Sequence, residues 1–179
     1  MQRILVTGVT GAGKSTLAQA LADAGGYPRL ELDAIYHQPG WEPLPRAAFR
    51  EEVSRFIARP RWVVDGNYSK VSDLIRARAD TLVFLDLPRW RVLSQLIPRT
   101  LDRVFSKREL WNGNVESPWG LLSPSPDKNI VLWSVLTHGK RKRQFRAAQA
   151  DASLAHLRFV RLGSRVEAQD FLKVLLAPL

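Results

Sequence analysis

The chain has 179 residues, of which 45% are hydrophobic, so it can bury one sizeable core and is expected to form a single domain over residues 1–179. It contains no cysteine and only three histidines, which excludes a disulfide framework, a thiol nucleophile and a cysteine-bound zinc site. No apolar run approaches the roughly 20 residues of a membrane span, and no signal peptide is recognisable. We therefore expect a cytoplasmic protein with no membrane partner.

The charge of the chain is strongly basic and unevenly distributed. Lysine and arginine number 27 against 17 acidic residues, for a formal net charge of +10. Twelve basic and four acidic residues lie between Arg89 and Arg146. Such a surface attracts phosphates or nucleic acid, although a solvated face is the alternative meaning of a charge run.

Strand-like and helix-like patterns alternate along the chain. The sequence predicts strands at 3–7, 29–32, 61–64, 81–85 and 157–162, and helices at 15–24, 46–58, 90–105 and 167–176. This alternation predicts an α/β fold, a three-layer sandwich in which a five-stranded parallel sheet carries helices on both faces. Ligands of such folds bind beyond the carboxyl ends of the strands.

Residues 106–128 and the basic helical stretch up to residue 150 do not fit this alternation, and we interpret them as one insertion. Long irregular segments of compact domains often act as lids. The sequence therefore predicts a lid region at about 99–128, in addition to an acceptor-binding segment at about 33–60.

Residues 8–15, with the sequence GVTGAGKS, follow the first strand and open the first helix. In this motif the backbone N–H groups of a glycine-rich loop surround phosphates, and the helix directs its positive end at them. The motif predicts ATP and Mg²⁺ as cofactors, with the lysine on the β and γ phosphates and the serine hydroxyl on magnesium. The expected nucleotide-binding residues are Gly8, Gly11, Ala12, Gly13, Lys14, Ser15 and Thr16.

Asp65 ends an apolar strand, where a site of this kind needs a carboxylate to anchor magnesium together with Ser15. The following Gly66-Asn67 leaves an ordinary turn residue as the alternative.

Several motifs together resemble the nucleoside-kinase and adenylate-kinase superfamily of P-loop proteins. They are the phosphate loop, as we name residues 8–15, with Thr16, then Asp33 after the second strand, Asp65-Gly66, Leu85-Asp86-Leu87-Pro88 and the arginines of the lid. The chain is most similar to bacterial topology-modulation, or adenylate-kinase-like, proteins through Leu32-Asp33 with Tyr36 and Trp41, Asp65-Gly66-Asn67-Tyr68, and residues 109–114 (ELWNGN). The resemblance implies a kinase.

Asp33 bears on the phosphoryl acceptor. A hydroxyl acceptor must lose its proton as it attacks, whereas a nucleoside monophosphate already offers an ionised oxygen. Asp33 matches the position of the acid that serves hydroxyl kinases of the superfamily, with a turn or helix cap as the alternative. Asp65-Gly66 is not followed by the arginine of typical adenylate kinases, which argues against plain AMP phosphorylation.

The segment that follows Asp33 supplies candidate acceptor-binding residues. Tyr36 and Trp41 offer flat surfaces for stacking, and Arg46 and Arg50, one helical turn apart, could clamp a phosphate. The alternatives are that the two aromatic residues only pack against their neighbours and that the two arginines lie on the solvent-exposed face of a helix.

Arg99 and Arg103 are spaced i, i+4 on the helix after the fourth strand and point the same way. We predict that they stabilise the charge of the transferring phosphoryl group, and so count them with Lys14 and Asp33 as catalytic candidates. A second basic cluster at residues 140–146 could contact nucleic acid, although consecutive charges spread around a helix.

These features predict an ATP-binding kinase that transfers the γ-phosphoryl group to a small nucleotide-like or hydroxyl-bearing acceptor. The alternatives are a kinase for the 5′-hydroxyl of a polynucleotide, and an ATP-binding regulatory module that acts on DNA.

Overall fold

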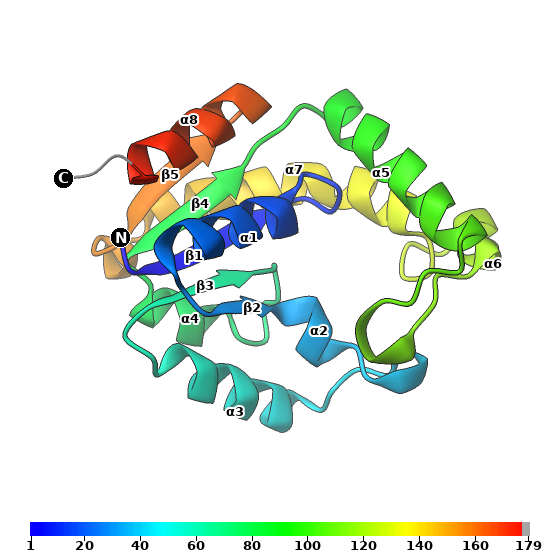
Figure 1. Cartoon of the computed structure of the whole chain (residues 1–179), viewed down its shortest axis with the longest axis horizontal. Helices are drawn as coiled ribbons and strands as arrows, with labels where there is room; N and C mark the ends of the chain where they lie inside the picture. Colours follow the sequence, from blue (N-terminus) through cyan, green and yellow to red (C-terminus); the bar gives the residue numbers. More distant parts are fainter. Residues whose placement is uncertain (177–179) are drawn as a thin grey trace.

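The computed structural model describes residues 1–176 and contains one five-stranded parallel sheet (Figure 1). The strands are β1 (Arg3–Gly8), β2 (Arg29–Glu31), β3 (Trp62–Asp65), β4 (Thr81–Leu85) and β5 (Arg158–Leu162), in the order β2-β3-β1-β4-β5. All neighbouring strands are parallel, so their carboxyl ends lie at one edge of the sheet. The predicted fold class is confirmed.

In the described part of the chain, eight α-helices connect and cover these strands. They are α1 (Lys14–Gly25), α2 (Leu32–Tyr36), α3 (Arg46–Ile57), α4 (Ser72–Arg78), α5 (Arg89–Phe105), α6 (Pro118–Leu122), α7 (Ile130–Ala150) and α8 (Arg165–Leu176). Three short 3-10 helices lie at Pro39–Trp41, Trp111–Gly113 and Ala152–Leu154.

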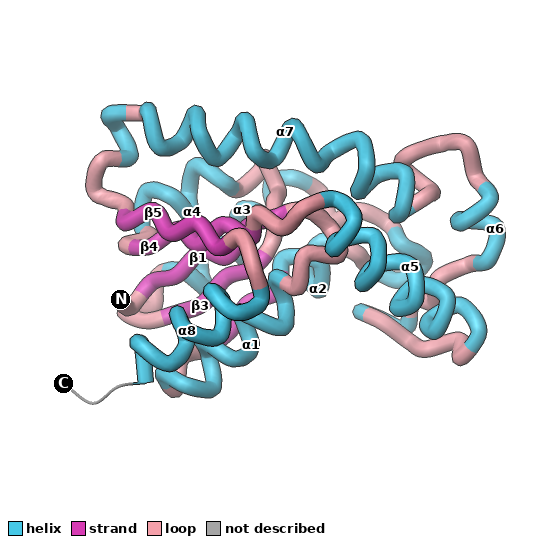
Figure 2. Tube along the Cα trace, turned by 90° about the horizontal axis from the view of Figure 1, so that it is seen from above, coloured by secondary structure: helices cyan, strands magenta, loops and turns pink. Residues whose placement is uncertain are grey.

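Alternate residues of the strands point to opposite faces and divide the core in two. Ile4 and Val6 of β1 pack in one cluster with the apolar side of α1, and part of α8 packs against this cluster. Leu5 packs in the other cluster with α3, α4 and Phe145 of α7. Figure 2 shows α7 and α8 on opposite sides of the sheet. The molecule therefore has the three layers predicted.

Helices α2, α4 and α6 are not among the predicted helices, and α6 lies in the segment 106–128 that was expected to be irregular. The second strand ends at Glu31 instead of residue 32, and Leu32–Tyr36 forms the short helix α2, so Asp33 lies in the first turn of that helix. Helix α4 was not predicted, because it has only seven residues and buries only Ile75 fully.

The interpretation of residues 106–150 as one insertion is wrong for its second half. Phe145 of α7 stacks on Phe84 of β4, with ring centroids 4.6 Å apart and an interplanar angle of 16°. Because this pair lies inside a core cluster, α7 is part of a helical layer of the sandwich.

Within residues 1–176, no helix is long and apolar enough to cross a membrane. In the same part of the chain, no three His, Asp or Glu side chains form a group that could hold a metal ion by themselves.

Candidate active site

The phosphate loop joins β1 to α1 at the carboxyl edge of the sheet. Gly11 and Gly13 both have φ of +91°, a backbone conformation that L side chains rarely adopt. Gly8 passes so close to β4 that an added Cβ would lie 2.9 Å from the carbonyl oxygen of Leu85. The glycines are thus required by the path of the loop, which leads the chain into the N-terminus of α1, an end that attracts anions.

Lys14 begins α1, and its ammonium group donates a hydrogen bond of 3.2 Å to the carbonyl oxygen of Val9. Burial lowers the pKa of Lys14, and the charges of Asp33 and Asp65 oppose that effect. An ammonium group with little water around it and two acids nearby is suited to phosphate oxygens that enter the loop. Ser15 follows half-buried, and Thr16 is exposed in the first turn.

Three polar side chains of β2 and β3, those of Arg29, Glu31 and Asp65, gather beside Ser15. The hydroxyl of Ser15 donates to Oε1 of Glu31 over 3.1 Å. Arg29 Nη2 lies 3.2 Å from Glu31 Oε2 and 3.2 Å from Asp65 Oδ1. Asp65 is only 2% exposed, and burial raises its pKa, while Ser15 and Arg29 oppose the rise.

This cluster fits the expected magnesium ion. Asp65 Oδ1 is buried and makes no hydrogen bond with the described residues; its close contact is the ion pair with Arg29 Nη2, so it can serve as a ligand where magnesium takes the place of that guanidinium group. Ser15 Oγ and the carboxylates of Asp65 and Glu31 are the hard oxygen donors that Mg²⁺ prefers. Glu31 has no role in the sequence prediction, although an acid at a strand end was a signal that could have found it.

Asp33 is held by Tyr68, a residue of another element of the site, and Tyr68 in turn contacts His37. The phenol of Tyr68 donates a hydrogen bond of 2.5 Å to Asp33 Oδ1, and its oxygen lies 3.2 Å from His37 Nε2. Burial and the charge of Asp33 raise the pKa of Tyr68, so the phenol keeps its proton. Because that proton points at Asp33, His37 Nε2 is the donor in the second contact. Burial lowers the pKa of His37, which favours this neutral form.

Asn67 joins the end of β3 to the phosphate loop. Its Oδ1 accepts from the Gly8 amide over 3.2 Å, and its Nδ2 donates to the Gly8 carbonyl oxygen over 2.6 Å. Asn67 and Tyr68 thus connect the segment after β3 to Gly8 and to Asp33, respectively. The sequence prediction gave neither residue a role.

The aromatic residues predicted to bind the acceptor pack against their neighbours. The ring of Tyr36 lies 4.6 Å from that of Tyr68, and its hydroxyl accepts a hydrogen bond of 2.8 Å from Lys70. Trp41 is 38% exposed, and its indole N–H donates to the carbonyl oxygen of Val115 over 3.2 Å. Tyr36 therefore lies beside Tyr68, the residue bonded to Asp33, whereas Trp41 lies in a contact between two loops.

That contact joins the lid region to the acceptor-binding segment (Figure 1). The buried Asn114 accepts from the backbone amide of Trp41 over 2.9 Å and donates to the carbonyl oxygen of Gln38 over 2.9 Å. Asn112 donates to the carbonyl oxygens of Ala34 and His37. Two asparagine side chains thus hold residues 112–114 against the segment that carries Asp33.

The structure does not bring Arg46 and Arg50 to this site. Arg50 Nη1 and Nη2 each donate to Asp73 over 2.8 Å, and Nη1 also donates to the carbonyl oxygen of Lys70. Arg46 is exposed at the start of α3, and its side chain makes no hydrogen bond with residues 1–176. Neither residue enters the site proposed below.

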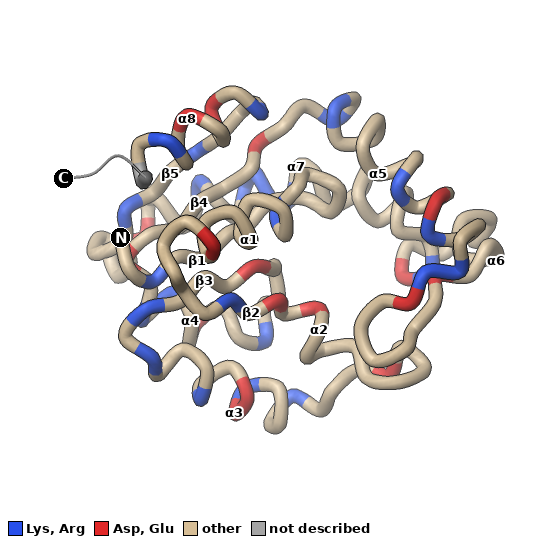
Figure 3. The backbone as a smooth tube through the Cα atoms, viewed as in Figure 1, with Lys and Arg blue, Asp and Glu red and all other residues tan. Residues whose placement is uncertain are grey.

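Arg99 and Arg103 lie one turn apart on α5, with Arg99 exposed and Arg103 half-buried. Arg103 forms an ion pair of 3.1 Å with Glu116 of the lid. Loss of water and the charge of Arg103 lower the pKa of Arg99, while Glu116, Asp33 and Glu31 oppose the shift. Arg99 therefore lies within electrostatic reach of the acids at the sheet edge, which Figure 3 shows together near the start of α2.

The basic cluster at residues 140–146 does not form one surface. Lys142 forms an ion pair of 2.9 Å with Asp86, and Arg141 lines a cavity beside the sheet, while Lys140, Arg143 and Arg146 are exposed. Arg141 is close enough for its charge to lower the pKa of Lys14. Its position near the phosphate loop depends on the packing of α7 and could not be predicted from a run of four charges.

No protein-family model and no curated protein matches this sequence. Among solved structures, the chain is similar to a gluconokinase from Sinorhizobium meliloti 1021, with a TM-score of 0.54, 21% identity, and coverage of 98% of this chain and 90% of that one. It is also similar to a shikimate kinase from Bacteroides thetaiotaomicron, with a TM-score of 0.56, 16% identity, and coverage of 97% of this chain and 96% of that one. A third similar structure is a shikimate kinase from Acinetobacter baumannii in complex with shikimate, with a TM-score of 0.56, 15% identity, and coverage of 98% of this chain and 91% of that one. At these identities the likeness shows the P-loop kinase fold.

Proposed function

We propose that this protein is an ATP-dependent phosphotransferase that moves the γ-phosphoryl group to a hydroxyl group of a small acceptor. The observation that carries the proposal is the carboxylate of Asp33, which Tyr68 orients and whose charge reaches both Lys14 and Arg99. A fixed base near a cationic phosphate site is what hydroxyl phosphorylation requires.

In the proposed reaction, the acceptor hydroxyl gives its proton to Asp33 as its oxygen attacks the γ-phosphorus. The bond between that phosphorus and the bridging oxygen of ADP breaks, and the electron pair leaves with ADP. Lys14 and Arg99 stabilise the charge on the phosphoryl oxygens. Magnesium, held by Ser15 and Asp65 with Glu31 beside them, would neutralise phosphate charge when bound.

A nucleoside monophosphate suits this arrangement less well. Its phosphate is already ionised and would meet the negative charge of Asp33, while Arg50, a candidate clamp for such a group, is paired with Asp73. The structural neighbours are called gluconokinase and shikimate kinase, and one of them holds shikimate. Those names favour a small-molecule acceptor.

Nothing in the described site favours a polynucleotide or DNA as the partner, because the basic residues of 140–146 point in different directions. The similarity to topology-modulation proteins stays a prediction, and it does not indicate which molecule accepts the phosphoryl group.

The proposal is tested by supplying γ-labelled ATP and magnesium with separate pools of sugars and hydroxy acids, nucleosides, nucleoside monophosphates and 5′-hydroxyl oligonucleotides. We expect label in a pool of small hydroxyl compounds, and none with the variant Lys14→Met. Label on AMP would contradict the role of Asp33. Label on oligonucleotides, lost steeply between low and moderate salt, would favour the polynucleotide kinase.

A further inference from the structure

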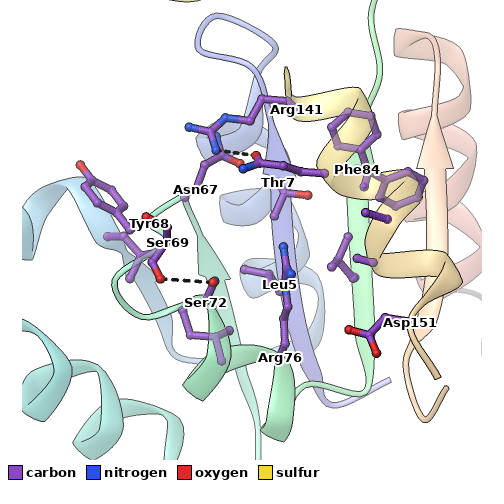
Figure 4. A pocket seen from close by; sticks show the side chains of 18 residues that line it. Leu5, Thr7, Asn67, Tyr68, Ser69, Ser72, Arg76, Phe84, Arg141 and Asp151 are labelled. Atoms are coloured by element: carbon purple, nitrogen blue, oxygen red, sulfur yellow. Dashed lines mark hydrogen bonds between the residues drawn. The ribbon is translucent and has the colours of Figure 1, made fainter. Parts of the chain in front are cut away.

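A cavity of about 290 Å³ lies between α4, α7 and the sheet (Figure 4). Its walls include Leu5 and Phe84 from the strands, Ile75 from α4, and Phe145 and Ala148 from α7. Protein interiors are normally packed with few voids larger than a water molecule, whereas small-molecule sites begin at about 300 Å³. The cavity is therefore large enough to hold a small ring.

Two arginines give this apolar space a positive charge. In Figure 4, the side chain of Arg76 extends along the cavity from α4, and Arg141 lies at its upper end. Arg76 Nε is buried and has no hydrogen-bond partner among residues 1–176. The Arg141 guanidinium donates one hydrogen bond of 2.9 Å, to Gln144, and burial lowers its pKa.

The acid nearest to this space does not neutralise it. Asp151 lines the cavity and is influenced by the charge of Arg76, but no ion pair within 4.0 Å joins the two. Its Oδ1 accepts from the amide and the hydroxyl of Ser153. A buried guanidinium nitrogen without a partner is costly unless an anion pairs with it, so the cavity favours an anionic ligand.

The upper end of the cavity meets the candidate active site. Thr7, Asn67 and Tyr68 are among its lining residues. Asn67 is hydrogen-bonded to Gly8 of the phosphate loop, and Tyr68 is hydrogen-bonded to Asp33. A ligand in the cavity would thus contact the residues that hold the loop and the proposed base.

We propose that the α4–α7 cavity binds an aromatic carboxylate, whose ring packs against Phe84 and Phe145 and whose carboxylate pairs with Arg76. Such a molecule could reach the cavity as the non-reacting part of the acceptor or as a separate effector. Only the first source rests on the proposed function; binding in the cavity does not.

The test is calorimetric titration of naphthoate into the wild-type chain and three variants. Arg76→Met removes the charge, and Arg78→Met is its control on the exposed side of the same short helix. Ala148→Leu fills the cavity from α7. We expect Arg76→Met to weaken binding by about tenfold or more, the ratio that one charge-assisted hydrogen bond supplies, and Arg78→Met to leave it unchanged. Ala148→Leu should abolish it.

Equal affinity of the two arginine variants, or wild-type binding by a folded Ala148→Leu, would overturn the proposal. Thermal unfolding shows whether each variant folds. If Ala148→Leu does not fold, the comparison of Arg76→Met with Arg78→Met tests the proposal by itself.

A second arm separates the two sources of ligand. Label from γ-labelled ATP on hydroxymethylbenzoate identifies the ligand as an acceptor, whereas naphthoate that changes ATP turnover without such labelling identifies an effector. Phosphoryl transfer to other hydroxyl compounds with no binding of naphthoate would refute the cavity proposal and leave the kinase proposal intact.

Discussion

Tyr68 and Asp33 lie 35 positions apart in the sequence and are joined by a hydrogen bond of 2.5 Å between the phenol and the carboxylate. The bond connects the segment after β3 to the helix that follows β2. It also fixes one oxygen of the proposed base, so that the other oxygen is left to face an acceptor.

Tyr68→Phe tests this positioning role. The variant keeps the ring that packs against Tyr36 but loses the bond to Asp33. We expect kcat to fall by about tenfold, since roughly 1–2 kcal/mol of orientation is lost, with the affinity for ATP unchanged. An unchanged kcat would show that Tyr68 only packs.

The arginines of α5 are tested by Arg99→Ala and Arg103→Ala. A positioned arginine in phosphoryl transfer is worth roughly 10³–10⁵ in rate, so turnover should fall by about 10³ or more with Arg99→Ala or with Arg103→Ala, while ATP binding stays nearly intact. Arg91→Ala is the control, because Arg91 is exposed on the same helix and its guanidinium lies over the ring of Trp90. Turnover that survives both site variants would refute the assignment.

Asn114→Ala tests the contact between the lid and the acceptor-binding segment. The substitution removes the bonds to the Trp41 amide and the Gln38 carbonyl oxygen, so backbone groups in that contact lose their partners. We expect a loss of about 1–3 kcal/mol in local stability, seen as faster hydrogen exchange of the Trp41 amide. Val115→Ala, at an exposed neighbour, should leave this exchange rate unchanged. Equal rates in the two variants would mean that Asn114 does not hold the lid.

The pairing of Arg50 with Asp73 makes a prediction about stability and pH. The hydrogen bonds from Arg50 lower the pKa of Asp73 to about 2 from an ordinary 3.8. A lowered pKa means that the folded state favours the carboxylate, so the stabilisation is complete above about pH 4 and is lost as the pH falls towards 2.

Asp73 is 62% exposed, so the free energy of unfolding should decrease by only about 0.5–1 kcal/mol in Asp73→Asn at pH 7. Urea unfolding of both proteins at pH 7 and near pH 3 measures this difference. A difference that grows as the pH falls would contradict the pairing.

The phosphate loop and the alternation of strands and helices could be predicted from the sequence, because both are local. The spacing of Gly8, Gly13, Lys14 and Ser15 determines the loop, and the apolar runs of the strands are short and distinct. The helix α7 could not be placed in this way. Its buried side includes Ser134, Thr137 and His138, so hydrophobic periodicity does not reveal which side packs on the sheet.

The acceptor side was predicted less completely, because its chemistry depends on pairs that lie far apart in the chain. Asp33 could be selected by its position after a strand, but its bond to Tyr68 appears only when β2 and β3 lie side by side. Arg50 has the right charge and spacing for a phosphate clamp, yet its Nη1 and Nη2 both donate to Asp73 on the neighbouring helix.

The most direct test of a hydroxyl kinase compares wild type with Asp33→Asn in the transfer of label from γ-labelled ATP to the small hydroxyl pool. General-base catalysis contributes roughly 10²–10⁴ in rate, so we predict that Asp33→Asn loses at least about a hundredfold in transfer, while calorimetry shows unchanged ATP affinity. Transfer by Asp33→Asn at the wild-type rate, or label that goes to AMP in both proteins, would contradict the proposed function.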